Sequence, residues 1–190
     1  VGITTVQAGL VDSITATAAE LNLLDGVSSL NSGATNVNGL SDVLVEQNSI
    51  WVGNDPSGTT NDAQYNVAIG TTALDAITTG DYNLGIGYNA LTANTTGLSN
   101  IALGYSTLNS NVSGDRNIAI GYQAGTAVTT GGDHVMIGHT AGAAITTQAT
   151  GVFVGYRAGF GSTGYSETII GSQAGTYGGG YNTVVGHNAM

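Results

Sequence analysis

The chain contains no cysteine and no lysine, and Arg116 and Arg157 are its only cationic residues apart from three histidines. Without cysteine, disulfide bonds and thiolate metal sites are excluded. The 12 acidic residues outnumber the two arginines and give a formal net charge of −10. Because a surface of this sign repels phosphate backbones, we expect no nucleic-acid partner.

Long apolar runs are missing too, and charged residues make up only 7% of the sequence. No run approaches the roughly 20 apolar residues that a helix needs to span a bilayer, so we expect no membrane insertion. At 190 residues, the chain is long enough for one ordinary domain with a core. It starts at Val1 and stops within a repeat, so we expect it to be a piece of a longer protein.

Glycine is abundant, with 31 residues, and much of it recurs at a fixed period. The stretch NIAIGYQAG at Asn117–Gly125 is a close relative of NLGIGYNAL at Asn83–Leu91. The glycine after each short apolar segment returns every 17 residues, and after 16 and 15 residues in the last two steps. This period predicts an all-β parallel β-solenoid of about nine coils of 15–17 residues, with one glycine at each corner. The corner glycines are Gly53, Gly70, Gly87, Gly104, Gly121, Gly138, Gly155, Gly171 and Gly186.

The residues before each corner glycine alternate with period two, as in a β-strand. Branched residues stand one and three positions before the glycine, so both columns share one side of the predicted strand. We expect this side to form the core. Its column next to the glycine is Ile69, Ile86, Leu103, Ile120, Ile137, Val154, Ile170 and Val185.

The residue between the two branched columns faces the other way. A coil of this size encloses only a thin core, so we expect other chains to contribute burial. The small residues of the middle column would let three strands approach a common axis. The expected trimer axis is lined by Ala68, Gly85, Ala102, Ala119, Met136 and Phe153.

Two polar columns accompany the strands. The first opens the strands and predicts a stacked asparagine ladder that satisfies its own amides. It contains Asn66, Asn83, Asn100, Asn117 and Asn182. The second is a loop glycine, for which we expect a turn with positive φ. It recurs at Gly80, Gly97, Gly114 and Gly131.

Residues 1–39 lack this register and are predicted to form a separate N-terminal module. Thr17 and Glu20 match a capping box, and Gly26 stands where a helix would stop, so we expect a short helix between them. The repeat domain is predicted to span residues 40–190, with Trp51 capping its first coil.

The repeat unit reads N-[VLI]-[AG]-[IL]-G-Y-x-A-L-x-x-N-T-T-G-x-x and resembles the head repeats of YadA-like trimeric autotransporter adhesins. More closely, it resembles the 17-residue version found in bacteriophage tail fibres, over about Ile50 to Met190. The stretch ITATAAELNLLDGV at Ile14–Val27 resembles a short module of phage tail-fibre proteins. The resemblance implies a left-handed parallel β-roll with three chains side by side, in a virion appendage or on an extracellular surface. The late units depart from the pattern, with His134, Gly151 and Glu167 in place of asparagine.

Residues that could carry chemistry are better explained by the solenoid. The GIGYNA stretch lacks the third glycine and the long helix of a dinucleotide loop. Asp81 and Asp115 share a column but stand two coils apart, too far to share a Ca²⁺ ion. No serine has a nucleophile-elbow context. We therefore expect no catalytic residue, no cofactor and no metal.

The column Tyr88, Tyr105, Tyr122 and Tyr156, with His139 between, is most simply a stacked ladder, and a carbohydrate-binding stripe is the alternative. Three functional classes remain open. The first is a phage fibre that binds its own copies and a glycan or protein on the host cell. The second is a bacterial surface adhesin or extracellular filament. The third is an ice-binding solenoid, indicated by threonine pairs at 78–79, 95–96, 129–130 and 146–147.

Overall fold

The structure is a computed structural model that describes residues 43–53, 56, 60–175, 177–178 and 180–190. The chain divides into two units, Val1–Ser41 and Asp42–Met190. The first unit, with the helix expected between Thr17 and Gly26, lies outside the described residues. Those that are described form a parallel β-solenoid of about seven turns and contain no helix.

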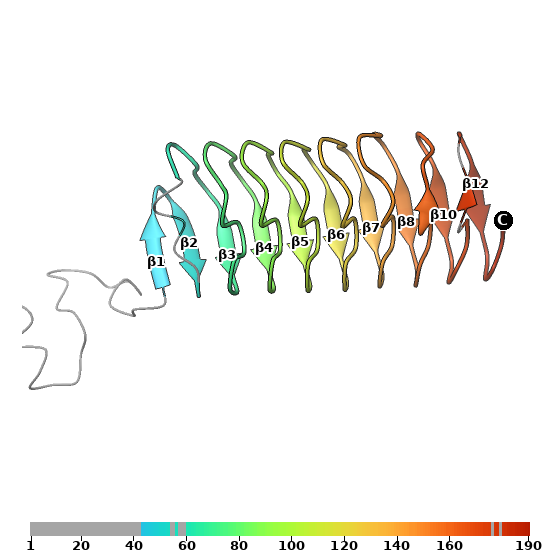
Figure 1. Ribbon diagram of the computed structural model, residues 1–190, viewed down its shortest axis with the longest axis horizontal. Helices are drawn as coiled ribbons and strands as arrows, with labels where there is room; N and C mark the ends of the chain where they lie inside the picture. Colours follow the sequence, from blue (N-terminus) through green and yellow to red (C-terminus); the bar gives the residue numbers. More distant parts are fainter. Residues whose placement is uncertain (1–42, 54–55, 57–59, 176, 179) are drawn as a thin grey trace, which may run out of the picture. The chain divides into compact units, whose positions relative to one another are not determined.

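Short strands follow one another along the stack (Figure 1). The main sheet has the order β1-β2-β3-β4-β5-β6-β7-β8-β10-β12; only the β1–β2 pair is antiparallel, and β9 pairs with β11 in a second, parallel sheet. The strands are β1 (Val43–Glu46), β2 (Ser49–Val52), β3 (Val67–Ile69), β4 (Leu84–Ile86), β5 (Ile101–Leu103), β6 (Ile118–Ile120), β7 (Val135–Ile137), β8 (Val152–Val154), β9 (Gly161–Ser162), β10 (Thr168–Ile170), β11 (Tyr177–Gly178) and β12 (Thr183–Val185).

The period of the sequence is also the register of the sheet. Ile101 pairs with Ile118, which pairs with Val135, in steps of 17 residues. The predicted parallel solenoid is thus confirmed, with about seven turns in place of about nine. The difference arises because a strand at either end of the stack does not by itself complete a coil.

The corner glycines have a backbone conformation that other residues avoid. From Gly70 to Gly186 their φ angles lie between +127° and +137°. A Cβ on Gly121 would also lie 2.6 Å from the carbonyl oxygen of Gly138 in the next coil. Both the φ angle and the close approach of the next coil therefore exclude a side chain.

The interior of the coils is lined by the column that was expected to face a trimer axis. Its members are fully buried within the single chain, or nearly so: Ala68, Gly85, Ala102, Ala119, Met136 and Phe153. The branched column expected in the core lies on the outside, where none of its members is buried: Ile69, Ile86, Leu103, Ile120, Ile137, Val154, Ile170 and Val185. The assignment of the two faces was therefore reversed. A narrow coil has room for one inward side chain from each three-residue strand.

Two interior columns share the available volume. In the first coils a leucine four residues after the corner glycine meets a small strand residue, as Leu74 meets Gly85. In later coils the strand residue is large and the leucine position is a glycine. A Cβ on Gly159 would lie 2.3 Å from Cδ1 of Phe153, and one on Gly125 would lie 2.7 Å from Cε of Met136. The core stays filled because the two columns change size in opposite directions.

The asparagine ladder is present and closes its own hydrogen bonds. The backbone N–H of Asn83 donates to Oδ1 of Asn66 at 2.8 Å, and its Nδ2 donates to the carbonyl oxygen of Gly97 at 2.9 Å. Asn100 repeats both bonds one coil further on. These amides are buried, and the ladder gives them partners without water.

The loop glycines do not have the positive φ expected of them. They are small because neighbouring coils approach closely: a Cβ on Gly97 would lie 2.5 Å from the carbonyl oxygen of Gly114 and 2.4 Å from Oδ1 of Asn94. The positive φ falls two residues later, at Tyr82, Ser99, Arg116 and Asp133.

Candidate functional site

The outer side of the main sheet carries two parallel columns of branched side chains, here called the aliphatic face. Leu103 and Ile137 are 41% and 37% exposed in the single chain. Neither column contains a charged residue between β3 and β8. An apolar strip of this length is unusual on the surface of a monomer and typical of an interaction site. It consists of Val67, Ile69, Leu84, Ile86, Ile101, Leu103, Ile118, Ile120, Val135, Ile137, Val152 and Val154.

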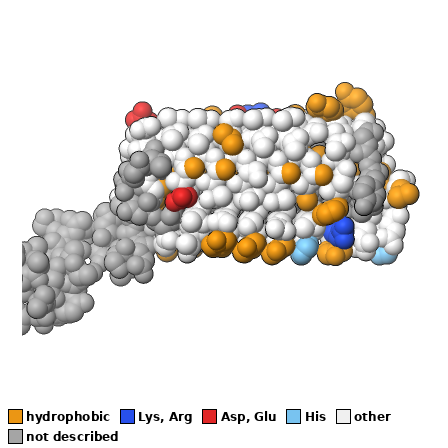
Figure 2. Space-filling view, viewed as in Figure 1, with side chains coloured by type: hydrophobic (Ala, Val, Ile, Leu, Met, Phe, Trp, Pro, Cys, Tyr) orange, Lys and Arg blue, Asp and Glu red, His pale blue; other side chains and the backbone are white. Residues whose placement is uncertain are grey.

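Beyond the corner glycines stands a second stripe, the ring ladder, formed by Tyr88, Tyr105, Tyr122, His139 and Tyr156. Successive ring centroids are 5.3, 5.1, 4.9 and 5.4 Å apart. Figure 2 shows a row of hydrophobic side chains, continued by a histidine, along the lower edge of the stack. The four tyrosines are about half exposed, so a stacked ladder turns ring edges and hydroxyl groups toward solvent.

The aspartates of the loop column hold backbone groups. Oδ1 of Asp81 accepts a hydrogen bond from the backbone N–H of Gln64 at 2.7 Å, and Oδ1 of Asp115 accepts one from the N–H of Leu98 at 2.7 Å.

Among the described residues, no three histidine, aspartate or glutamate side chains come together as metal ligands. The same part of the chain contains no helix with the length and apolarity needed to cross a bilayer.

In three of the threonine pairs, the hydroxyl of the first threonine is bonded within the protein. The hydroxyl groups of Thr78, Thr95 and Thr129 donate to carbonyl oxygens of the following coil at 2.9, 3.1 and 3.3 Å. The donor hydrogens of these three hydroxyl groups are therefore committed within the protein, while Thr79, Thr96 and Thr130, the second members of the same pairs, are exposed.

His134 takes over the asparagine position in the ladder and is buried. Its Nε2 lies 2.9 Å from the carbonyl oxygen of Gln148, and its Nδ1 lies 3.0 Å from the backbone N of Gly151. A carbonyl can only accept and an N–H can only donate, so the ring is the neutral tautomer protonated on Nε2. Burial lowers the pKa of His134 below its ordinary value, although Asp133 nearby opposes this.

We expect acidification to destabilise the stack through His134. The unfolded chain takes up a proton near pH 6.5, whereas the folded chain does so only at its lowered pKa. The contribution of neutral His134 is therefore complete above pH 6.5 and is lost as the pH falls through the folded pKa. Thermal unfolding followed from about pH 8 to about pH 5 measures this loss.

His134→Asn is the matched control for that experiment, because it restores the ladder residue of the earlier coils and removes the titrating group. We expect its stability to change less with pH over the same range. Identical pH profiles for the two proteins would contradict the assignment.

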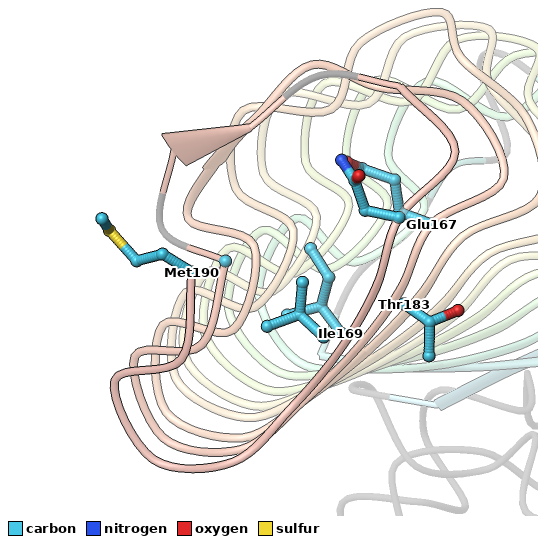
Figure 3. A pocket seen from close by; sticks show the side chains of 7 residues that line it. Glu167, Ile169, Thr183 and Met190 are labelled. Carbon is cyan, nitrogen blue, oxygen red and sulfur yellow. The ribbon is translucent and has the colours of Figure 1, made fainter.

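Glu167 occupies the same ladder column nearer the end of the stack and is also buried. The hydroxyl of Ser162 donates to its Oε2, and Nδ2 of Asn182 donates to its Oε1 at 3.2 Å. Burial raises the pKa of Glu167. Glu167 and Ile169 line a cavity of about 220 Å³. Figure 3 shows the side chains of both residues at this cavity. This cavity lies between the last two described coils.

No protein-family model, curated protein or solved structure matches the chain.

Two features of the candidate site were not predicted from the sequence. The first is the outward orientation of the aliphatic face, and the second is the contact of Arg157 with Phe160. The opposing size changes of the two interior columns were a usable signal for the first. No periodic signal marks the second, because each of these residues occurs once in its column.

Proposed function

We propose that the chain is a structural and adhesive segment of a phage virion fibre, such as a tail fibre, that assembles from three copies and supports or forms the surface for host attachment. The observation that carries this proposal is the aliphatic face. The repeat motif supports the assignment to a virion appendage. The left-handed winding and the three-fold arrangement are parts of the proposal, and so is the absence of catalysis.

The aliphatic face fits association with further copies of the same chain. Its side chains stand in register along the sheet, so identical strips can align over their whole length. Burying half-exposed branched side chains is favourable by roughly 25 cal/mol per Å² of apolar surface. When such a strip faces a three-fold axis, it contacts both neighbouring copies and leaves no copy with an exposed strip.

We expect Ile120→Glu to yield a monomer, because the charge of each copy would be buried near the other two without a partner. Multi-angle light scattering measures the mass, and circular dichroism checks the β-structure. Thr96→Glu adds the same charge at an exposed position outside the aliphatic face, and we expect it to assemble normally. An unmodified chain that is monomeric with normal β-structure would overturn the proposed assembly.

Ala102→Glu and Ala119→Glu would not test the assembly. Both side chains are fully buried inside the coil. A glutamate there would disrupt the solenoid itself, so its effect on assembly could not be separated from unfolding.

A bacterial surface adhesin or extracellular filament could use the same aliphatic face. Electron microscopy with an antibody against residues 43–190 separates the two origins. Labelling of a virion appendage supports the proposed function, whereas labelling of the cell envelope in virus-free cultures overturns it in favour of the adhesin.

A further inference from the structure

The two ends of the solenoid differ in charge. All acidic residues but one lie at or before Asp133, and the exception, Glu167, is buried. Beyond Asp133 the exposed surface therefore presents no acidic side chain, while it carries Arg157. An anion approaching this part of the chain meets no side chain of like charge nearby.

Arg157 differs from the other arginine in having no acidic partner. Arg116 holds Asp133 through two nitrogens at 2.6 and 2.9 Å. Among the described residues no carboxylate lies within ion-pairing distance of Arg157. Its Nε is buried and makes no hydrogen bond, so the guanidinium has given up water there without gaining a partner.

The guanidinium of Arg157 is held in place by Phe160, and the backbone of this arginine is bonded to the coil that carries His139. Its Cζ lies 4.1 Å from the ring centroid of Phe160, which restrains the side chain by a cation–π contact. The backbone N–H of Arg157 donates to the carbonyl oxygen of His139 at 2.9 Å. Figure 2 shows a basic side chain close to hydrophobic and histidine side chains at the lower edge. A guanidinium that is already positioned loses little freedom when it binds an anion.

The ring ladder ends at the same place. Its first three pairs are nearly parallel, with interplanar angles of 20°, 7° and 19°, but His139 and Tyr156 are inclined by 41°. The next residue of the column after Tyr156 is Ser172, and among the described residues no ring stacks on the far side of Tyr156. Tyr156, the residue directly before Arg157, therefore keeps one ring face without a stacked ring. At the opposite end, Tyr88 follows Thr71 in the column and no arginine is adjacent.

We propose that Arg157 and Tyr156 form a binding site for a carboxylate-bearing sugar unit of a cell-surface glycan. The terminal nitrogens of Arg157 donate to the carboxylate, and the apolar side of the sugar ring packs on the free face of Tyr156. The tyrosine hydroxyl bonds a hydroxyl group of the sugar. This inference rests on the proposed attachment function and names its partner.

Direct binding to the purified chain tests the site. The probes are sialyllactose beside lactose, and trigalacturonate beside its methyl ester, followed by NMR shift changes and calorimetry. We expect both acidic sugars to bind and their neutral counterparts to bind at least about tenfold more weakly, because the neutral sugars cannot accept the charge-assisted hydrogen bonds of Arg157. Arg157→Gln and Tyr156→Ser should each reduce binding of the acidic sugars about tenfold or more.

Matched controls lie elsewhere on the same chain. Arg116→Gln removes the other arginine, Tyr88→Ser removes the ring at the other end of the ladder, and both should leave binding unchanged. No binding of either acidic sugar, equal binding of the neutral sugars, an equal loss in Arg116→Gln, or equal binding of inorganic phosphate or tetraglutamate would each overturn the site. A trimeric, virion-associated chain that binds no acidic sugar overturns this inference alone. A monomer that binds such sugars overturns only the proposed assembly.

Discussion

Gly121→Ala is expected to destabilise the solenoid by about 2–6 kcal/mol. The φ angle of Gly121 is +129°, a region that is essentially reserved for glycine and costs of order 1–3 kcal/mol for other residues. The new Cβ would also lie 2.6 Å from the carbonyl oxygen of Gly138, so two coils would have to separate, and overpacking of this kind costs about 1–3 kcal/mol. Urea unfolding at constant pH measures the loss.

Gly186→Ala is the matched control for this prediction. Gly186 has nearly the same φ angle, +135°, but a Cβ there would meet no atom closer than 3.6 Å. It should therefore show only the conformational cost, about 1–3 kcal/mol. If both variants lose the same free energy of unfolding, close stacking of the coils is not what requires glycine at the corner.

Phe153→Ala is expected to cost about 3–5 kcal/mol, because the ring is fully buried and its removal leaves a cavity. Gly159→Leu should also be destabilising, by about 3 kcal/mol, because its side chain would collide with that ring. The combination Phe153→Ala with Gly159→Leu places a leucine beside a small strand residue of its own coil, as Leu108 stands beside Ala102, while Ile169 of the next coil stays large. We expect it to be more stable than either single variant.

The backbone at residue 159 is suited to this exchange. Gly159 has a φ of +59°, and Leu108 has +49° at the equivalent position, so a leucine can adopt the conformation. Chemical denaturation of the three variants and the parent closes a double-mutant cycle, with an expected interaction energy of about 2–3 kcal/mol in favour of the pair. Additive effects would show that the two interior columns do not share one volume.

The recurrence of the corner glycines was sufficient to predict the parallel stack and its register. A glycine at every seventeenth position, each after a short apolar strand, predicts that residues 17 apart pair in the sheet. Ile101 does pair with Ile118. The asparagine ladder followed from the same columns. These features depend only on which residues of successive coils stack on one another, and aligning the repeats identifies those residues.

The inner and outer faces of the strand could not be read in the same way. Alternation shows that Ile118 and Ile120 share a side, but both sides are apolar here, and the larger side chains suggested the core. Coil width decides the matter, because the interior accepts only one strand residue from each coil, and Ala119 is that residue. A stronger signal was the replacement of Leu108 by Gly125 just before alanine gives way to Met136.

Single departures from the repeat were the least predictable features. The two ring nitrogens of His134 replace the acceptor and the donor of an asparagine amide. Predicting this replacement would require knowing that Gly151 and Gln148 lie on either side of the ring. The loop glycines were correctly located but explained by the wrong cause. Their size is required by a neighbouring carbonyl oxygen, and that contact is visible only when the coils are stacked.

The bonding of the asparagine ladder also bears on how such a gene can change. Each rung is joined to residues 17 positions back and 14 positions ahead, and never to a unique partner elsewhere in the chain. Unequal recombination that adds or deletes one whole repeat would thus replace every bond with an equivalent one. A lineage could lengthen or shorten the stack by whole repeats without a new residue, and so change its length in steps of one coil.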